Sequence, residues 1–224
     1  MFIAIEGLDG SGKATQTRLL YEYLKKVHKE TEMLSYPKYG EPCCTPVQMY
    51  LDGAFGKSPS DVNAYTASIF FAVDRYADYK LNWEEKYIKN YWFVSDRYVQ
   101  SNMIHQLTKL PQEDWETYIK WISDLEYKRN NLPTPDLTIY LDVEPSISQR
   151  LLLERYRADK RDIHERDKEY LAECHKIARH LATKQDWAVI PCTVNGGLMS
   201  VEAIHSQICE IVDDKFASDL DIVL

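Results

Sequence analysis

One glycine-rich segment near the N-terminus constrains this 224-residue chain more than any other feature. Residues 7–13, GLDGSGK, have the spacing GxxxxGK and stand between an apolar run at 2–6 and a helical pattern at 13–27. Glycines let backbone N–H groups turn inward around a phosphate, and the N-terminus of the next helix adds positive potential. The lysine that ends such a loop reaches the outer phosphates of a nucleotide. The segment therefore predicts a strand, a phosphate-binding loop and a helix in succession.

The alternation of apolar runs and helical patterns extends over the whole chain. Strands are expected at 2–6, 33–36, 92–96, 137–143 and 187–191, and helices at 13–27, 61–91, 111–130, 145–156, 169–183 and 201–213. Strands that alternate with helices favour a parallel sheet covered on both faces. The prediction is an α/β fold of the P-loop NTPase type: three layers, α/β/α, around a five-stranded parallel sheet. Residues 1–224 are expected to form a single domain.

Composition narrows the class of partner and the compartment. The 45% hydrophobic fraction excludes a disordered or fibrous chain, and the net charge of −8 argues against nucleic acid or an anionic membrane as a partner. The five cysteines are an odd number without a CxxC pair, so a disulfide framework is not expected. The start of the chain lacks the pattern of a secretory signal. Together these features predict a cytoplasmic protein.

The residue after the loop lysine departs from the usual pattern. A serine or threonine there would ligate Mg²⁺, but this chain has Ala14, which carries no side-chain oxygen. Thr15 is turned about 100° away along the helix. Asp96 and Asp9 are the candidate metal ligands, with nucleotide phosphates and water completing the octahedron.

Four motifs in order resemble those of the thymidylate (dTMP) kinases. Residues 2–16 resemble the start of these enzymes, and 96–102 with Gln106 are similar to their DRYxxSxxxxQ segment. Residues 70–76 resemble the FxxxR nucleobase segment, and 133–137 match the PDL entry to a strand. The resemblance implies an enzyme that phosphorylates dTMP to dTDP with ATP and Mg²⁺ in dTTP biosynthesis, and a homodimer.

The same resemblance implies a role for each matching residue. Asp9 would approach the sugar, Phe71 would stack on thymine and Arg75 would bond its carbonyl oxygen. Arg97 and Lys38 would hold phosphate, Ser101 and Asn102 would line the base pocket, and Arg150 would pack on adenine. For ATP, the family implies contacts from Gly7, Asp9, Gly10, Ser11, Gly12, Lys13, Ala14, Thr15 and Arg150.

Physical arguments from the residues support part of this assignment. Phe71 and Arg75 stand at i, i+4 on a predicted helix, where an aromatic face and an oriented donor can meet one flat base. The alternative is a core aromatic beside a solvated arginine. Arg97 follows the end of a predicted strand, at the sheet edge where α/β proteins bind ligands. Its alternative is a surface pair with Asp96.

Two further departures concern the sugar and the lid. His105 stands where the family often has a tyrosine near the sugar, which leaves discrimination against ribonucleotides open; an ordinary exposed histidine is the alternative. Ser11 is not basic, so the arginine that one subgroup carries in the loop is absent. A lid at about 155–166 would then supply the mobile cations, with Arg157 and Arg161 catalytic, although a charged run can also be a solvated face.

Other phosphate-loop proteins fit the sequence less well. A GTPase-like switch needs DxxG after the third strand, but Asp96 has no such glycine, and the TKxD sequence at 183–186 precedes a strand instead of following one. Adenylate kinases have glycine where Ala14 stands, and deoxynucleoside kinases usually have ERS or DRS where this chain has Asp96-Arg97-Tyr98. A deoxynucleoside kinase, or a nucleoside monophosphate kinase with another base preference, remains the alternative function.

Overall fold

The central sheet is built from five parallel strands. The computed structural model describes residues 1–155, 164 and 168–217. The strands are β1 (Phe2–Gly7), β2 (Thr31–Ser35), β3 (Trp92–Asp96), β4 (Leu137–Asp142) and β5 (Ala188–Pro191), and their order is β2-β3-β1-β4-β5. All pairings are parallel, and β1 lies in the middle between β3 and β4. The predicted five-stranded parallel sheet is confirmed.

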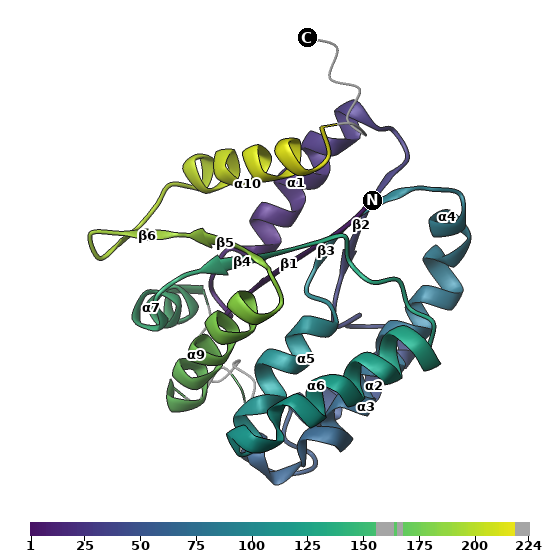
Figure 1. The fold of residues 1–224 in the computed structure, drawn as a ribbon. Coiled ribbons are helices and arrows are strands. Elements are labelled where there is room, and N and C mark those ends of the chain that lie inside the picture. The colour runs from purple at the N-terminus through teal and green to yellow at the C-terminus, as the bar shows by residue number, and fades with distance from the viewer. Residues whose placement is uncertain (156–163, 165–167, 218–224) are drawn as a thin grey trace.

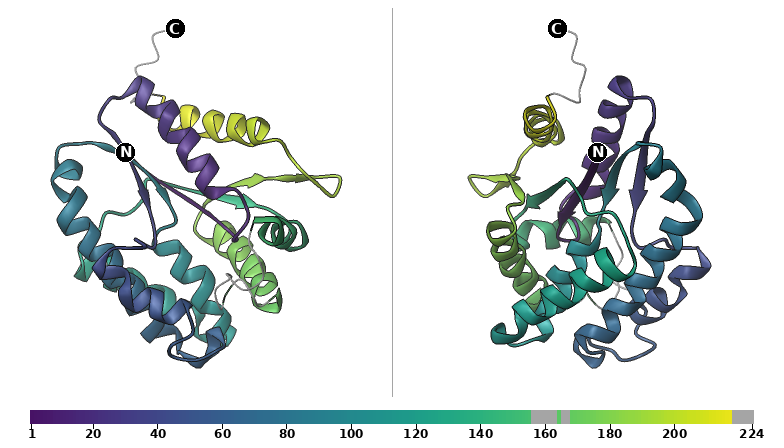
Figure 2. Two further views of the ribbon diagram at one scale, coloured as in Figure 1. Left: turned by 180° about the vertical axis from the view of Figure 1, so that it is seen from behind. Right: turned by 45° about the vertical axis from the view of Figure 1, so that its right-hand side comes forward.

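Side chains of β1 alternate between two apolar cores, one on each face of the sheet. Phe2 and Ala4 belong to one core, and Ile3 and Ile5 to the other. On the second face lie α1 (Lys13–Val27) and α10 (Val201–Lys215); on the first lie α3 (Ala64–Asp78), α5 (Val99–Gln106), α6 (Trp115–Ser123) and α9 (Lys168–Lys184) (Figure 1). The view from behind shows the same separation of the helices (Figure 2). The three predicted layers are confirmed.

Two long helical segments are interrupted by wider π-turns. The predicted helix at 61–91 consists of α3, the π-turn η3 (Tyr79–Trp83) and α4 (Glu84–Ile88), after the short turn η2 (Pro59–Asp61). The segment at 111–130 contains η5 (Gln112–Asp114), α6 and the π-turn η6 (Asp124–Arg129). A π-turn adds a residue to the helical repeat and often lies at a functional site. Here η6 carries Glu126, which is fully buried.

Several elements were not predicted. These are α2 (Thr45–Leu51), α5, the short turns η1 (Pro42–Cys44) and η4 (Leu107–Lys109), and a hairpin of β6 (Thr193–Val194) and β7 (Gly197–Leu198). Helix α5 gives no amphipathic pattern because nearly all of its residues are buried, polar ones included. The remaining helix, α7 (Pro145–Arg155), follows β4 as predicted. No helix in the described ranges is long and apolar enough to cross a membrane.

Candidate active site

The phosphate loop lies at the carboxyl end of the central strand. β1 ends at Gly7 and α1 begins at Lys13, so the intervening residues form the predicted turn between strand and helix. Gly10 and Gly12 have φ angles of 81° and 86°, in the left-handed region that favours glycine. A Cβ atom at Gly10 would also lie 2.5 Å from the carbonyl oxygen of Ser148. The backbone conformation therefore favours glycine at both positions, and at Gly10 the close approach to α7 requires it as well.

Lys13 is held within the loop. Its side chain is 7% exposed, and Nζ donates a hydrogen bond of 2.8 Å to the carbonyl oxygen of Leu8. Nζ also lies 3.9 Å from Oδ1 of Asp9. Burial and the Arg97 cation lower the pKa of Lys13 to about 8, although Asp9 acts in the opposite direction. The ammonium is therefore aimed into the loop, while Ala14 on the next position is exposed to solvent.

Asp9 and Arg97 join the loop to the turn after β3. The Arg97 guanidinium forms an ion pair with Asp9, and its Nη1 donates 3.2 Å to Oγ of Ser101. Burial alone would raise the pKa of Asp9, but the Arg97 and Lys13 cations outweigh it and hold that pKa well below its usual range. Arg97 is paired with Asp9 and only 14% exposed in its side chain, so the alternative of a surface pair with Asp96 is wrong.

A pocket opens directly beside this ion pair. It is bordered by the phosphate loop, α3, α5 and the segment after β2. Its lining includes Asp9, Tyr36, Pro37, Tyr39, Phe71, Arg75, Arg97, Ser101, Asn102, His105, Gln106 and His164. Six of the residues predicted to bind substrate thus line the same pocket: Asp9, Phe71, Arg75, Arg97, Ser101 and Asn102. His105, the seventh, also lies there. Positions spread over the first half of the sequence converge on one cavity.

Arg75 is buried in this pocket and paired with Glu126 of η6. The guanidinium is 2% exposed and the carboxylate 0%, and an ion pair with a hydrogen bond joins them. Burial would lower the pKa of Arg75, but Glu126 raises it above its ordinary value. The alternative of a solvated arginine is therefore wrong. Among the described residues, Nε of Arg75 and both amide atoms of the buried Gln106 have no hydrogen-bond partner.

Two predicted site residues lie elsewhere, and two more lie outside the described residues. Nζ of Lys38 is 3.2 Å from Oδ1 of Asp78, and its side chain does not line the pocket. Arg150 is exposed on α7. Arg157 and Arg161, with most of the predicted lid at 155–166, lie outside the described residues. The roles assigned to these four side chains stay predictions.

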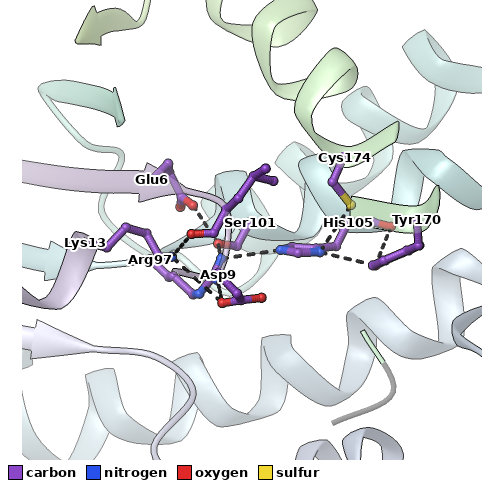
Figure 3. Close-up of polar contacts among 9 residues, drawn as sticks. Glu6, Asp9, Lys13, Arg97, Ser101, His105, Tyr170 and Cys174 are labelled. Carbon is purple, nitrogen blue, oxygen red and sulfur yellow. Dashed lines mark hydrogen bonds and ion pairs between the residues drawn. The ribbon is translucent and has the colours of Figure 1, made fainter. Parts of the chain in front are cut away.

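His105 is buried beside the pocket and is not an ordinary exposed histidine. Only 7% of it is exposed; Nε2 lies 3.4 Å from Nη1 of Arg97, and Nδ1 lies 3.2 Å from the hydroxyl of Tyr170 (Figure 3). The ring stacks on His164 at a centroid distance of 5.3 Å. Burial and the Arg97 cation lower the pKa of His105 to about 3. Its imidazole is therefore neutral near pH 7.

Asp96 is the carboxylate whose surroundings best fit a metal ion. Its Oδ1 is buried and has no partner within the described part of the chain, whereas Oδ1 of Asp9 is engaged by Arg97 and lies near Lys13. A carboxylate oxygen suits Mg²⁺, which commonly binds one or two carboxylates together with substrate phosphates and water. No group of three or more His, Cys, Asp or Glu side chains in the described ranges is placed to hold a metal. Asp96 thus fits the predicted role better than Asp9.

Sequence reasoning assigned no role to Gln106 or Glu126. A signal for Glu126 exists, because it continues the buried stripe of Tyr118 and Ile122 at i+4 spacing, where an acid is out of place without a partner. Gln106 had matched a family motif, but its complete burial could not be inferred from its position in the chain. Gln106 became visible only as part of the folded pocket, and the structure shows Glu126 to be the buried partner of Arg75.

The fold and the loop define a P-loop α/β protein, with a phosphate-binding loop at the end of its central strand and a cationic pocket beside it. Residues 5–208 match the family model described as thymidylate kinase. A probable thymidylate kinase of Pyrobaculum aerophilum is 33% identical over 159 residues, 71% of this chain and 73% of the relative. The thymidylate kinase of Mycobacterium tuberculosis is 28% identical over 208 residues, covering 89% and 95%. The chain belongs to the thymidylate kinase family.

A solved structure supports the fold. The crystal structure of thymidylate kinase from Ehrlichia chaffeensis superposes with a TM-score of 0.67 at 20% identity, covering 95% of this chain and 98% of that chain. At this identity the likeness concerns the fold. It agrees with the five-stranded parallel sheet and the helices on both of its faces.

Proposed function

We propose that this chain transfers the terminal phosphoryl group of ATP to the phosphate of dTMP, giving ADP and dTDP. The observation that carries the proposal is the Asp9–Arg97 ion pair, which lies on the wall of the pocket and belongs in part to the phosphate loop. A nucleotide in the loop and a second nucleotide in the pocket would therefore meet at this pair. Family membership supplies the identity of the two nucleotides.

The inner end of the pocket suits a pyrimidine base. Phe71 offers an aromatic face, and Arg75 and Gln106 offer buried donors and an acceptor that have no partner among the described residues. A base edge that carries carbonyl and N–H groups would satisfy such atoms, which are costly to leave unpaired. In this proposal Asn102 and Ser101 complete the wall, and His105 lies toward the sugar.

The reaction needs positive charge more than it needs a base. The acceptor phosphate has a second pKa of about 6, so it is already an ionised nucleophile near pH 7. Lys13 and the N-terminus of α1 would stabilise the phosphates of ATP, and Arg97 would hold the acceptor phosphate. Catalysis is then mainly positioning and electrostatic stabilisation. Arg157 and Arg161 remain the predicted lid cations.

Mg²⁺ is the proposed cofactor, with ATP as co-substrate. When bound, the metal neutralises phosphate charge during transfer. Asp96 would hold it, directly or through water, because its buried Oδ1 has no partner among the described residues and Ala14 offers no side-chain oxygen. Asp9 is less suited, since Arg97 already occupies its carboxylate.

One assay tests the proposed activity. ADP release is measured with ATP and each of dTMP, dUMP, dGMP, dAMP and UMP, with Lys13→Ala as the negative control. We expect the highest kcat/KM with dTMP and only background turnover in the variant. A higher kcat/KM with dGMP or dAMP would assign the pocket to a purine and overturn the proposal. Comparison of dUMP with UMP measures discrimination against ribose, which the sequence leaves open because His105 stands where the family often has a tyrosine.

We also propose a homodimer formed through α3. Ile69, Val73 and Tyr76 are 47%, 48% and 42% exposed, and their i, i+4, i+7 spacing puts them on one face of the helix. An exposed apolar stripe of this kind marks an interaction surface. Val73→Asp is expected to shift the protein to monomers in sedimentation experiments. Val194→Asp, at a residue 53% exposed on β6, is the matched control and should leave the mass unchanged.

A cytoplasmic location is proposed from the state of the thiols. Cys43, Cys44, Cys174, Cys192 and Cys209 are all free cysteines. A reducing compartment preserves such thiols. Localisation of a tagged chain by fluorescence would test this proposal.

A further inference from the structure

Glu6 is a buried carboxylate to which the reaction assigns no role. It is the residue before the loop glycine Gly7 on β1, and it is 0% exposed. Its two oxygens have separate partners: Oε1 accepts 2.8 Å from the backbone N–H of Tyr98, and Oε2 accepts 2.6 Å from Oγ of Ser101. Both partners belong to the segment after β3, which also carries Arg97. Glu6 therefore links the central strand to the turn that presents the acceptor-side arginine.

That turn has an unusual backbone. Arg97 has a φ of 66°, in the left-handed region that residues other than glycine seldom adopt. Such a conformation is strained and persists only where its surroundings hold it. Arg97 N–H donates 3.0 Å to the carbonyl oxygen of Ile5, and its own carbonyl oxygen accepts 2.6 Å from Oγ of Ser95. Glu6 fixes the next residue, Tyr98, so the turn is held on both sides of Arg97.

Glu6 also acts on the guanidinium through Ser101. Burial raises the pKa of Glu6, while the Arg97 cation and the hydrogen bonds from Ser101 and Tyr98 act in the opposite direction. The Ser101 hydroxyl donates to Oε2 of Glu6. Its lone pairs are then directed to Nη1 of Arg97, which donates to Oγ over 3.2 Å. Figure 3 shows Glu6, Ser101 and Arg97 connected in this way, with Asp9 at the other side of the guanidinium. Glu6 thus begins a chain of hydrogen bonds that passes through the Ser101 hydroxyl to the guanidinium.

We propose that Glu6 is a positioning residue for the acceptor nucleotide: it holds Arg97 in its left-handed turn and orients the Ser101 hydroxyl toward the guanidinium. This inference rests on the proposed function, in which Arg97 binds the acceptor phosphate. Glu6 is too deeply buried to touch either nucleotide itself. Its loss should therefore affect binding of the acceptor and leave binding of ATP nearly unchanged.

Glu6→Gln is the direct test, because it preserves size and an acceptor for Tyr98 N–H. The new amide N–H₂ would donate to Ser101 and reverse the hydroxyl toward the Arg97 cation. We expect KM and Kd for dTMP to rise about tenfold, in line with loss of a charge-assisted hydrogen bond, and KM for ATP to change less than twofold. Glu32→Gln, at a half-exposed glutamate of β2 paired with Lys86, should change neither constant.

A merely structural role predicts a different pattern. If Glu6 only supports the fold, Glu6→Gln lowers the active fraction and hence kcat, while both KM values stay at the wild-type level; that result overturns the proposal. An equal rise in both KM values also overturns it. Wild-type protein that does not phosphorylate dTMP would instead overturn the proposed function, so the two failures are distinguishable.

Combination with Arg97 shows whether Glu6 acts through it. In the Arg97→Ala background, Glu6→Gln should change the Kd for dTMP less than twofold, because the group that it positions is gone; a further tenfold loss would contradict the mechanism.

Ser95→Ala gives an independent test should Glu6→Gln fail to fold. It removes the hydrogen bond to the Arg97 carbonyl and should raise the Kd for dTMP about threefold, with ATP binding unchanged. An unchanged Kd for dTMP in Ser95→Ala would overturn the proposal that dTMP binding depends on how this turn holds Arg97.

Discussion

The phosphate loop and the acceptor pocket reach their chemistry by different routes. Everything in the loop comes from the consecutive residues between the end of β1 and the start of α1. In the pocket, Arg75 and Glu126 are 51 residues apart, Asp9 and Arg97 are 88 apart, and His105 and Tyr170 are 65 apart. Backbone N–H groups can surround a phosphate locally, whereas recognition of a base needs side chains from several elements. The pocket is therefore more tightly coupled to folding than the loop.

The largest effect on stability is expected in the pocket, from Glu126→Leu. The substitution leaves the Arg75 guanidinium buried without its partner, which costs about 3–5 kcal/mol in the free energy of unfolding. Urea denaturation at pH 7 measures it. Glu116→Leu is the matched control, because Glu116 forms an exposed pair with Lys120 on α6 and should have little effect. If both substitutions change the free energy of unfolding by a similarly small amount, the pocket is not coupled to folding in this way.

The double variant Arg75→Met/Glu126→Leu separates stability from recognition. Replacing both members of a buried ion pair by apolar side chains should restore most of the stability. Binding of dTMP should nevertheless remain weaker by about 1.5–3 kcal/mol, the range for a hydrogen bond to a charged group, while ATP binding changes little. Calorimetric titration with each nucleotide provides the measurement. Equal weakening for ATP and dTMP would show that Arg75 serves the other nucleotide.

In the loop, Lys13→Ala should affect chemistry far more than folding. Loss of a main electrostatic stabiliser lowers kcat by about 10²-fold or more, which corresponds to about 2.7 kcal/mol. The free energy of unfolding measured in urea should change much less than it does in Glu126→Leu. Arg18→Ala, at an exposed arginine on the same helix, is the control for activity. Near wild-type turnover in folded Lys13→Ala protein would refute the assignment of the loop.

A further prediction concerns the stability of the protein at acidic pH. Because the pKa of buried His105 is lowered to about 3, the unfolded chain binds a proton below about pH 6.5 that the folded protein does not take up until about pH 3. Stability is therefore lost as the pH falls through this window, by about 2 kcal/mol at pH 5. Denaturation at pH 7 and pH 5 should show a smaller difference for His105→Gln than for wild type. The partly exposed His180, replaced by glutamine, controls for a general effect of histidine loss.

The smallest effects are expected for the metal. Asp96→Asn should raise the Mg²⁺ concentration needed for half-maximal activity, because an amide binds Mg²⁺ less well than a carboxylate whose buried Oδ1 has no partner in the described part of the chain. Ala14→Ser should lower that concentration or leave it unchanged. An unaltered Mg²⁺ titration in Asp96→Asn would place Asp96 outside the metal's surroundings. The metal would then depend on ATP and water alone.

Most strands were predictable because they are short apolar runs between turn residues; β2, with the sequence TEMLS, was predicted at 33–36 and lies at Thr31–Ser35. The prediction for β3 is identical to the observed range, and that for β1 differs by one residue. Helix α5 was missed since its buried Asn102, His105 and Gln106 hide the pattern that a helix with one polar face would show. The TKxD sequence at 183–186 ends α9 before β5, which confirms that it does not follow a strand.

The sequence by itself determined the loop and the sheet and indicated candidate residues for the chemistry, because glycine spacing, strand patterns and a lysine at the start of a helix act locally. Tertiary structure decided the partners: Arg97 pairs with Asp9, Arg75 with Glu126, and Lys38 with Asp78. A charged side chain can meet any opposite charge that the fold brings near, and only burial makes one pairing much more favourable than the others. For the same reason the proposed role of Glu6 depends on the folded turn beside Arg97: Glu6 stands within a motif, but its partners Tyr98 and Ser101 come from a distant segment.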